Sequence, residues 1–220
     1  MNTHTLRRLS GLTLILAGPL CILGGVLHPV VDGHAHDVHA LTTDHAVGSL
    51  ALLAGEVLLL LGLPAVYGWL APRLGVTGLV GFVLYVLGNM LNAVPHLVIM
   101  GFAGDHLAEN HPDALSENDV ILAAPAFEAE QIVTGIMFLV GLLLFGIALT
   151  RAAGLPRWIG AVAIVGAILP FVPLPVVEVV TGIQIETARA VAVMALGYLA
   201  WKSVAPRTVP TGDPVSAGRP

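Results

Sequence analysis

Polar side chains recur at helical spacing inside a long apolar stretch at 75–102. They are separated by four, three and four residues, which places all of them on one face of a helix. The four residues are Tyr85, Asn89, Asn92 and His96. Polar groups inside a membrane are costly, so such a face indicates either a site or hydrogen bonding between helices. His96 could serve there as a base or orienting group, and the other three could position a substrate.

The apolar stretch before it, at 46–70, has a polar face of its own. His45, Ser49 and Glu56 are separated by four and seven residues. Counted outward from the turn between the two stretches, Glu56 lies level with Asn89, so the two faces can meet across an antiparallel hairpin. Glu56 would lie roughly 20 Å from the inner end of its helix. A carboxyl group at that depth must be protonated or paired, and in a dry pocket it could act as a general acid.

Further polar residues fall within the later apolar stretches. Glu128 and Gln131 share one face of a predicted helix at 121–150, and Glu178 lies near the outer end of the next helix. We predict that they help to bind a substrate, although the acids could instead lie at the membrane surface. Arg189, one turn into the last helix, is a natural partner for a carboxylate. The candidate partners are Glu130, Glu178 and Glu186.

A second possible chemistry lies in the loop that precedes residue 46. His34, His36 and His39 stand close together, and His45 follows at the end of the loop. Imidazole at this density, mixed with aspartate, can bind a divalent metal ion on the outer side. No rigid element fixes the spacing, so a solvated loop without a ligand is the alternative interpretation.

The elements that must position these residues are membrane-spanning helices. Hydrophobic residues make up 56% of the 220 and charged residues 10%, with a mean hydropathy of +0.90. Each apolar stretch is near or above the length of about 20 residues that a spanning helix needs. The sequence predicts an all-α bundle of six transmembrane helices over 1–205 and a disordered tail at 206–220. The helices are predicted at about 9–30, 46–70, 75–102, 121–150, 157–181 and 184–203.

The basic residues predict the orientation of this bundle. All of them except Arg189 fall on one side of the six-helix arrangement, whereas almost every acid and histidine falls on the other. Basic residues favour the cytoplasmic side, so both termini are expected there, in a multi-pass protein of a bacterial plasma membrane. The lipid bilayer is the expected partner, and no basic patch suggests nucleic acid.

A short internal repeat accompanies this pattern. Residues 58–63 resemble 142–147, and Pro72-Arg73 then matches Pro156-Arg157 at the same offset. The repeat suggests that the second and third helices and the fourth and fifth helices form parallel hairpins. Repeats of this kind can place a site at their interface.

The run GLPRWIG at 154–160 and the Gly-, Ala-, Val- and Leu-rich helices resemble small uncharacterised membrane proteins of actinobacteria. That resemblance implies a membrane bundle and no particular activity. The chain also resembles small membrane-integral terpene cyclases, compact helical bundles that use acidic residues to protonate an olefin or epoxide. This second resemblance implies that Glu56 is such an acid.

Three kinds of function are consistent with these sequence features. The first is an enzyme that acts on a lipophilic, isoprenoid or lipid-like molecule. The second is a metal- or proton-coupled transporter or metal-binding protein, and the third is a non-catalytic accessory or sensor subunit. Few polar residues continue inward below Glu56, which favours a site open to the outer side only. The sequence does not indicate the oligomeric state.

Overall fold

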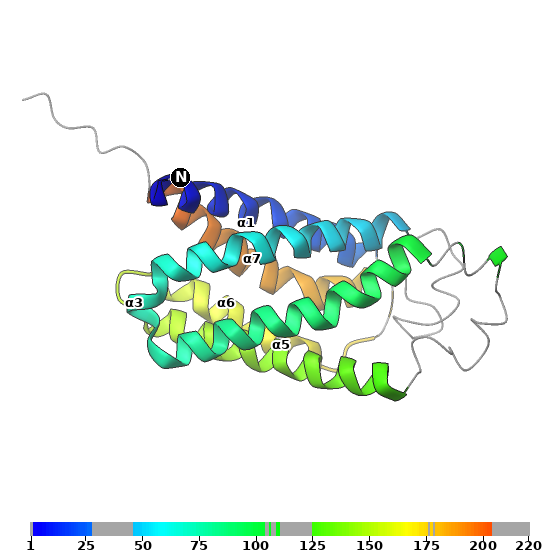
Figure 1. Cartoon of the computed structure of the whole chain (residues 1–220). Helices are drawn as coiled ribbons and strands as arrows, with labels where there is room; N and C mark the ends of the chain where they lie inside the picture. Colours follow the sequence, from blue (N-terminus) through cyan, green and yellow to red (C-terminus); the bar gives the residue numbers. More distant parts are fainter. Residues whose placement is uncertain are drawn as a thin grey trace, which may run out of the picture.

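Apolar helices form nearly all of the described chain, which comprises residues 2–27, 46–103, 106, 109–110, 125–175, 177 and 179–203 of a computed structural model. The helices lie side by side as a bundle (Figure 1). A π-helical turn, η1 (Ile99–Ala103), follows the second helix, and a 3-10 turn, η3 (Leu169–Phe171), follows the fourth. The five helices are α1 (Thr3–Val26), α3 (Ala46–Val98), α5 (Pro125–Arg151), α6 (Arg157–Ile168) and α7 (Val180–Lys202).

Helix α3 runs the length of the bundle twice. The chain reverses at Gly75, whose φ of 60° and ψ of −164° are open mainly to glycine. Tyr67 before the turn stacks on Phe82 after it, with ring centroids 4.0 Å apart. The two limbs of α3, before and after Gly75, are therefore antiparallel helices (Figure 1). The described chain thus has six helical segments, as the sequence predicts, and the turn between the second and third lies where it was expected.

The six helical segments form a closed ring. α1 contacts the first limb of α3 and also α7, while α5 contacts the second limb and α6, and α6 contacts α7. Small residues permit a close approach between α1 and α7: a Cβ placed on Gly11 would lie 2.6 Å from the carbonyl oxygen of Gly197. Side chains that point into this ring can therefore contact side chains of helices far apart in the sequence.

Helix α6 is much shorter than the helix predicted at 157–181. It ends at Ile168, and the residues that the structure describes between η3 and Val180 are not helical. Pro170, Pro173 and Pro175 explain this end, because proline removes a backbone donor and clashes with the preceding turn. The turn expected near residues 181–182 is also wrong, since both residues lie in the first turn of α7. With 12 residues, α6 rises about 18 Å, less than the hydrocarbon thickness of about 30 Å.

The side chain of Gln184 on α7 compensates for part of this break. Its Nε2 donates hydrogen bonds to the carbonyl oxygens of Leu169, at 2.8 Å, and Val172, at 2.7 Å. A non-helical backbone at membrane depth is tolerated only when protein or water satisfies its polar groups. Gln184 therefore closes the ring where α6 ends.

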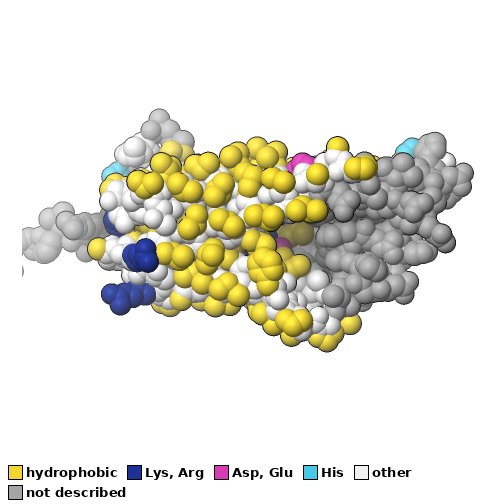
Figure 2. Space-filling view, turned by 90° about the horizontal axis from the view of Figure 1, so that it is seen from below, with side chains coloured by type: hydrophobic (Ala, Val, Ile, Leu, Met, Phe, Trp, Pro, Cys, Tyr) yellow, Lys and Arg dark blue, Asp and Glu magenta, His cyan; other side chains and the backbone are white. Residues whose placement is uncertain are grey.

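The outer surface and the two ends of the bundle differ in character. Among the described residues, four helices are long and apolar enough to cross a membrane, and one of these is the doubled α3. Hydrophobic side chains cover the face in Figure 2, and Lys and Arg gather at one end. Arg7 and Arg73 both lie against the ring of Trp69 there, 5.4 and 5.3 Å from its centroid. We call this the basic end. Its cytoplasmic placement, like the hairpin repeat, stays a prediction.

Candidate functional site

Glu56 is the most deeply buried acid of the described chain, with 1% of its surface exposed. It extends from the first limb of α3 and accepts a hydrogen bond from Nδ2 of Asn89 on the second limb. This contact confirms the prediction that the two residues lie level. Tyr85 on the second limb and Ser49 on the first are also buried. The two polar faces of the hairpin therefore point into the ring.

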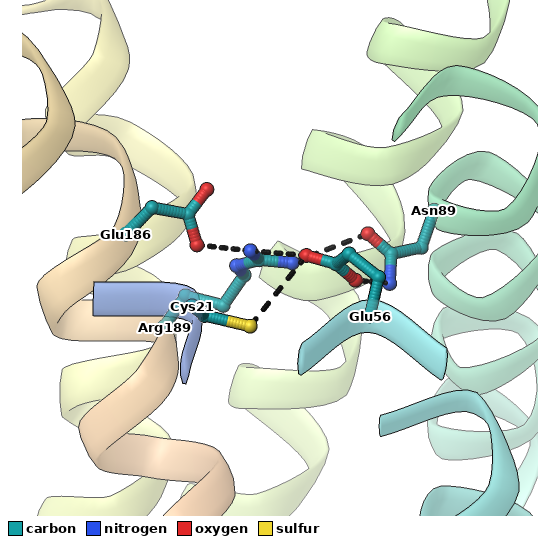
Figure 3. Close-up of polar contacts among 5 residues, drawn as sticks. All are labelled: Cys21, Glu56, Asn89, Glu186 and Arg189. Carbon is teal, nitrogen blue, oxygen red and sulfur yellow. Dashed lines mark hydrogen bonds and ion pairs between the residues drawn. The ribbon is translucent and has the colours of Figure 1, made fainter. Parts of the chain in front are cut away.

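Arg189 of α7 reaches across the ring to these residues. Its Nη1 donates to Oδ1 of Asn89 at 3.2 Å, and its Nη2 donates to Oε1 of Glu56 and Oε2 of Glu186 (Figure 3). Only 2% of Arg189 is exposed. One guanidinium therefore holds two carboxylates, one from α3 and one from its own helix.

Of the three partners predicted for Arg189, the structure brings Glu186 to it. The carboxylate of Glu130 instead accepts a hydrogen bond from Nε2 of Gln131 at 2.7 Å, and Glu178 lies outside the described residues. Sequence reasoning paired Arg189 only with acids of the later helices. It did not anticipate the bond to Glu56, because 133 residues separate the two and no local spacing connects them.

The remaining helices of the ring also meet at this point. Sγ of Cys21 on α1 lies 3.8 Å from Oε1 of Glu56, as a donor, and Cζ of Arg189 lies 5.3 Å above the ring of Phe138 on α5. On α6, a Cβ placed on Gly166 would lie 3.0 Å from the backbone nitrogen of Arg189. We use the name buried cluster for the five residues of Figure 3: Cys21, Glu56, Asn89, Glu186 and Arg189.

Two polar atoms beside the buried cluster have no hydrogen-bond partner within the described part of the chain. They are the hydroxyl of Tyr85 and Nε of Arg189. Tyr85 is completely buried one turn from Asn89, and its ring lies 5.4 Å from that of Phe138. Buried polar atoms usually have a partner. A water molecule or a polar group of a ligand would find two donors here.

The charges of the buried cluster do not balance. Glu56 and Glu186 are two carboxyl groups, and Arg189 is the one cation that contacts them among the described residues. With both acids ionised, a single negative charge remains in an apolar surrounding, which is costly. One proton, or one other monovalent cation, makes the cluster neutral. This imbalance distinguishes the cluster from a simple buried ion pair.

A second group of polar residues lies one turn outward, between α3 and α5. Nδ2 of Asn92 donates to the backbone carbonyl and to Oε1 of Gln131, at 3.0 and 3.2 Å, and to Oγ1 of Thr134 at 3.4 Å. These side chains are only partly buried, except for Thr134. We call Asn92, Gln131, Thr134 and Glu130 the outer polar group. Asn92 and Gln131, each predicted separately to help bind a substrate, thus lie in contact.

Several predicted site residues fall outside the described structure. The residues outside the description are Glu178 and the four histidines proposed as metal ligands, His34, His36, His39 and His45. For His96 and Glu128 only the helical backbone is described. Their predicted roles stay predictions.

The structure does offer a different set of possible metal ligands. One ligand atom each from Cys21, Glu56 and Glu186 lies within 4.8 Å of the others. However, Arg189 donates to both carboxylates in that space. A cation could bind only if the guanidinium moved aside, because the two would repel each other.

Sequence reasoning named Glu186 and Arg189 but gave neither a role in the site, and it gave none to Cys21. One signal was available. Arg189 is the single exception to the one-sided distribution of basic residues, and Glu186 stands three residues before it, a spacing that lets helical side chains pair. A buried arginine that departs from the orientation rule is itself an indication of a site.

No protein-family model matches the chain, and no match is found among the curated proteins or the solved structures. The resemblances drawn from the sequence therefore receive no support from relatives.

Proposed function

We propose that this is a multi-pass protein of a bacterial plasma membrane whose buried cluster holds one exchangeable proton and gives it to a lipophilic substrate. The observation that carries the proposal is the pairing of two buried carboxyl groups with a single arginine. The apolar helices support the membrane location. The basic end supports a cytoplasmic position for both termini.

The proton belongs on Glu186 rather than on Glu56. Glu56 accepts hydrogen bonds from Asn89, Arg189 and Cys21, and each of these donors stabilises a carboxylate. Among the described residues, Glu186 accepts a hydrogen bond from Arg189 alone. Two acids whose surroundings differ in this way separate into an anion and a proton donor. This changes the expectation from sequence, in which Glu56 was the acid: Glu56 becomes the ionised partner and Glu186 the general acid.

Charge balance supports proton transfer to an apolar molecule. When Glu186 gives its proton to the π electrons of an olefin, the substrate gains a positive charge and the cluster gains a negative one. The new cation then lies beside the new anion in a low dielectric, where their attraction is strong. The reaction ends when a proton leaves the substrate cation and returns to the cluster. No oxidant or other reactant is needed.

The packing on either side of the cluster favours a site open only outward. Toward the basic end, the ring is filled by fully buried apolar side chains such as Leu59, Leu63 and Leu149. In the other direction lie the outer polar group and the end of α6. A transporter needs access from both sides, whereas an enzyme needs one. A lipophilic, isoprenoid-like substrate fits an apolar bundle with a few convergent polar groups.

Deuterium incorporation tests this function even when the product is unidentified. The purified protein is incubated in D2O with polyprenes, polyprenyl alcohols and phospholipids in neutral detergent, and recovered lipids are analysed by mass spectrometry. We expect one class to gain a carbon-bound deuterium. Glu186→Gln should slow this by about 10²- to 10⁴-fold, the range for general acid catalysis. Glu109→Gln removes an exposed carboxyl group outside both the buried cluster and the outer polar group and serves as the control.

The results that would oppose the proposal are equally specific. Undiminished incorporation in folded Glu186→Gln would remove its proton from the mechanism. An absence of incorporation from every lipid class, together with normal folding of both variants, would favour an accessory subunit in which the cluster only joins helices.

A metal- or proton-coupled transporter is the second candidate, supported by the closeness of Cys21, Glu56 and Glu186. It predicts bound metal in the purified protein, or pH-dependent flux into vesicles that Glu186→Gln abolishes. The apolar packing toward the basic end counts against it, because that packing offers an ion no polar path.

A further inference from the structure

A groove of about 390 Å³ lies at the basic end, over the start of α1 and the end of α7. Twelve residues of α7 separate its Trp201 from Arg189, a rise of about 18 Å along the helix axis. The groove therefore plays no part in the proposed reaction. The residues that line it are His4, Thr5, Arg8, Leu9, Leu12 and Trp201.

The lining changes from polar to apolar along α1. Arg8 and Leu12 are four residues apart and so lie on the same side of the helix. Residues 4 to 12 rise about 12 Å along the axis, which covers the distance from a lipid headgroup to the first part of an acyl chain. Leu9 and Leu12 are 51% and 44% exposed. The groove therefore offers a cation at one end and uncovered apolar surface at the other.

The charged side chains that the structure describes around the groove are basic, namely Arg7, Arg8 and Lys202. Nη2 of Arg7 donates to the carbonyl oxygen of Ser203 at 3.5 Å, which brings α1 and α7 together here, and Lys202 lies over the ring of Tyr198. The sequence has no acid between residues 1 and 31 or between 187 and 212. Trp201 adds the type of side chain that favours the boundary between lipid and water. An anion would meet attraction at this end, and neither α1 nor the end of α7 brings a carboxylate to it.

We propose that this groove binds an anionic phospholipid, with its phosphate at Arg8, His4 and Thr5 and one acyl chain along Leu9, Leu12 and Trp201. Basic pockets between helices on the cytoplasmic side are suited to anionic headgroups. Arginine is the strongest phosphate partner among these residues, because its planar guanidinium donates two parallel hydrogen bonds.

Lipid binding to the full-length protein in neutral detergent tests the proposal. Native mass spectrometry would compare phosphatidylglycerol with phosphatidylcholine carrying the same acyl chains. We expect a clear preference for phosphatidylglycerol and its reduction by about fivefold in Arg8→Gln, the effect of one basic residue near the surface. Arg157→Gln is the matched control, since Arg157 is a basic residue of α6 that does not line the groove. It should change binding by less than about twofold, because surface charges at a distance are screened.

Three outcomes would overturn the proposal. An equal loss in Arg8→Gln and Arg157→Gln would mean a diffuse attraction by the whole basic end. Equal binding of the two lipids would mean no anion site. Displacement of phosphatidylglycerol by millimolar inorganic phosphate would mean a phosphate site with no contribution from the acyl chain. Leu12→Gln gives a positive check, because it should weaken the binding of long-chain phosphatidylglycerol and leave the binding of a dihexanoyl analogue unchanged.

Discussion

The half of the bundle between the basic end and the buried cluster contrasts with the half beyond it. In the first, which we call the inner half, regular helices pack around apolar side chains that are almost completely buried, among them Leu59, Leu63, Leu70, Leu149 and Ile159. In the outer half, α6 has ended, the π-helical η1 follows α3, and polar residues face one another. The same ring of helices is thus built in two ways.

The contrast suggests that the inner half provides stability and that the buried cluster and outer half provide the chemistry. Apolar packing depends on no charge or proton, so the stability that it gives the inner half should depend little on pH. The buried cluster needs every partner, because an unpaired charge in an apolar surrounding is costly. If the outer half carries function, its polar contacts should be individually sensitive, whereas changes in the inner half should act only through stability.

Arg189→Met should have the largest effect, because it leaves two buried carboxyl groups without their cation. Removing one partner of a buried ion pair costs about 3–5 kcal/mol. The loss should shrink as the pH falls, since protonation removes the uncompensated charge. Thermal unfolding in detergent measures it. The triple variant that adds Glu56→Gln and Glu186→Gln should recover most of the loss, and a triple variant as unstable as Arg189→Met would show that the arginine acts by packing alone.

Leu63→Ala should follow in size. Leu63 is completely buried in the inner half, and a cavity left by leucine in a close-packed core costs about 2–5 kcal/mol. We expect a lower unfolding temperature with no change in deuterium incorporation per folded molecule. Leu61→Ala is the matched control, because Leu61 is 65% exposed on the same helix. A specific loss of activity in Leu63→Ala would break the separation between the two halves.

Gln184→Leu should have an intermediate and local effect. It removes two hydrogen bonds to the carbonyl groups of Leu169 and Val172, each worth about 0.5–1.5 kcal/mol. Hydrogen exchange should rise in the segment after α6 and stay constant in α1. Thr150→Val, which removes a side-chain hydrogen bond to the carbonyl oxygen of Ile147 within α5, is the control. Equal exchange in the two variants would mean that Gln184 does not hold the segment.

These elements show which features of the fold and the site can be predicted from the sequence. The number of helical segments, the turn at Gly75 and the match of Glu56 with Asn89 follow from hydropathy and helical spacing, which are local. The prolines at 170, 173 and 175 predict a break in this helix, because they remove backbone donors. The end of α6 at Ile168 was not predicted, because the apolar stretch continues to residue 181. The bond between Arg189 and Glu56 depends on closure of the ring, and no local pattern contains it.

Asn92→Ala should have the smallest effect on stability and so sharpens the contrast within the outer half. Its Nδ2 donates to Gln131 and Thr134 across α3 and α5, and hydrogen bonds between membrane helices are worth about 0.6 kcal/mol on average. If the outer polar group only joins helices, unfolding should shift by this amount and deuterium incorporation should not change. If it positions a substrate, the Michaelis constant should rise more than stability falls. Asn89→Ala distinguishes the buried cluster from the outer polar group. It removes a donor to the Glu56 carboxylate and should therefore lower stability more than Asn92→Ala does.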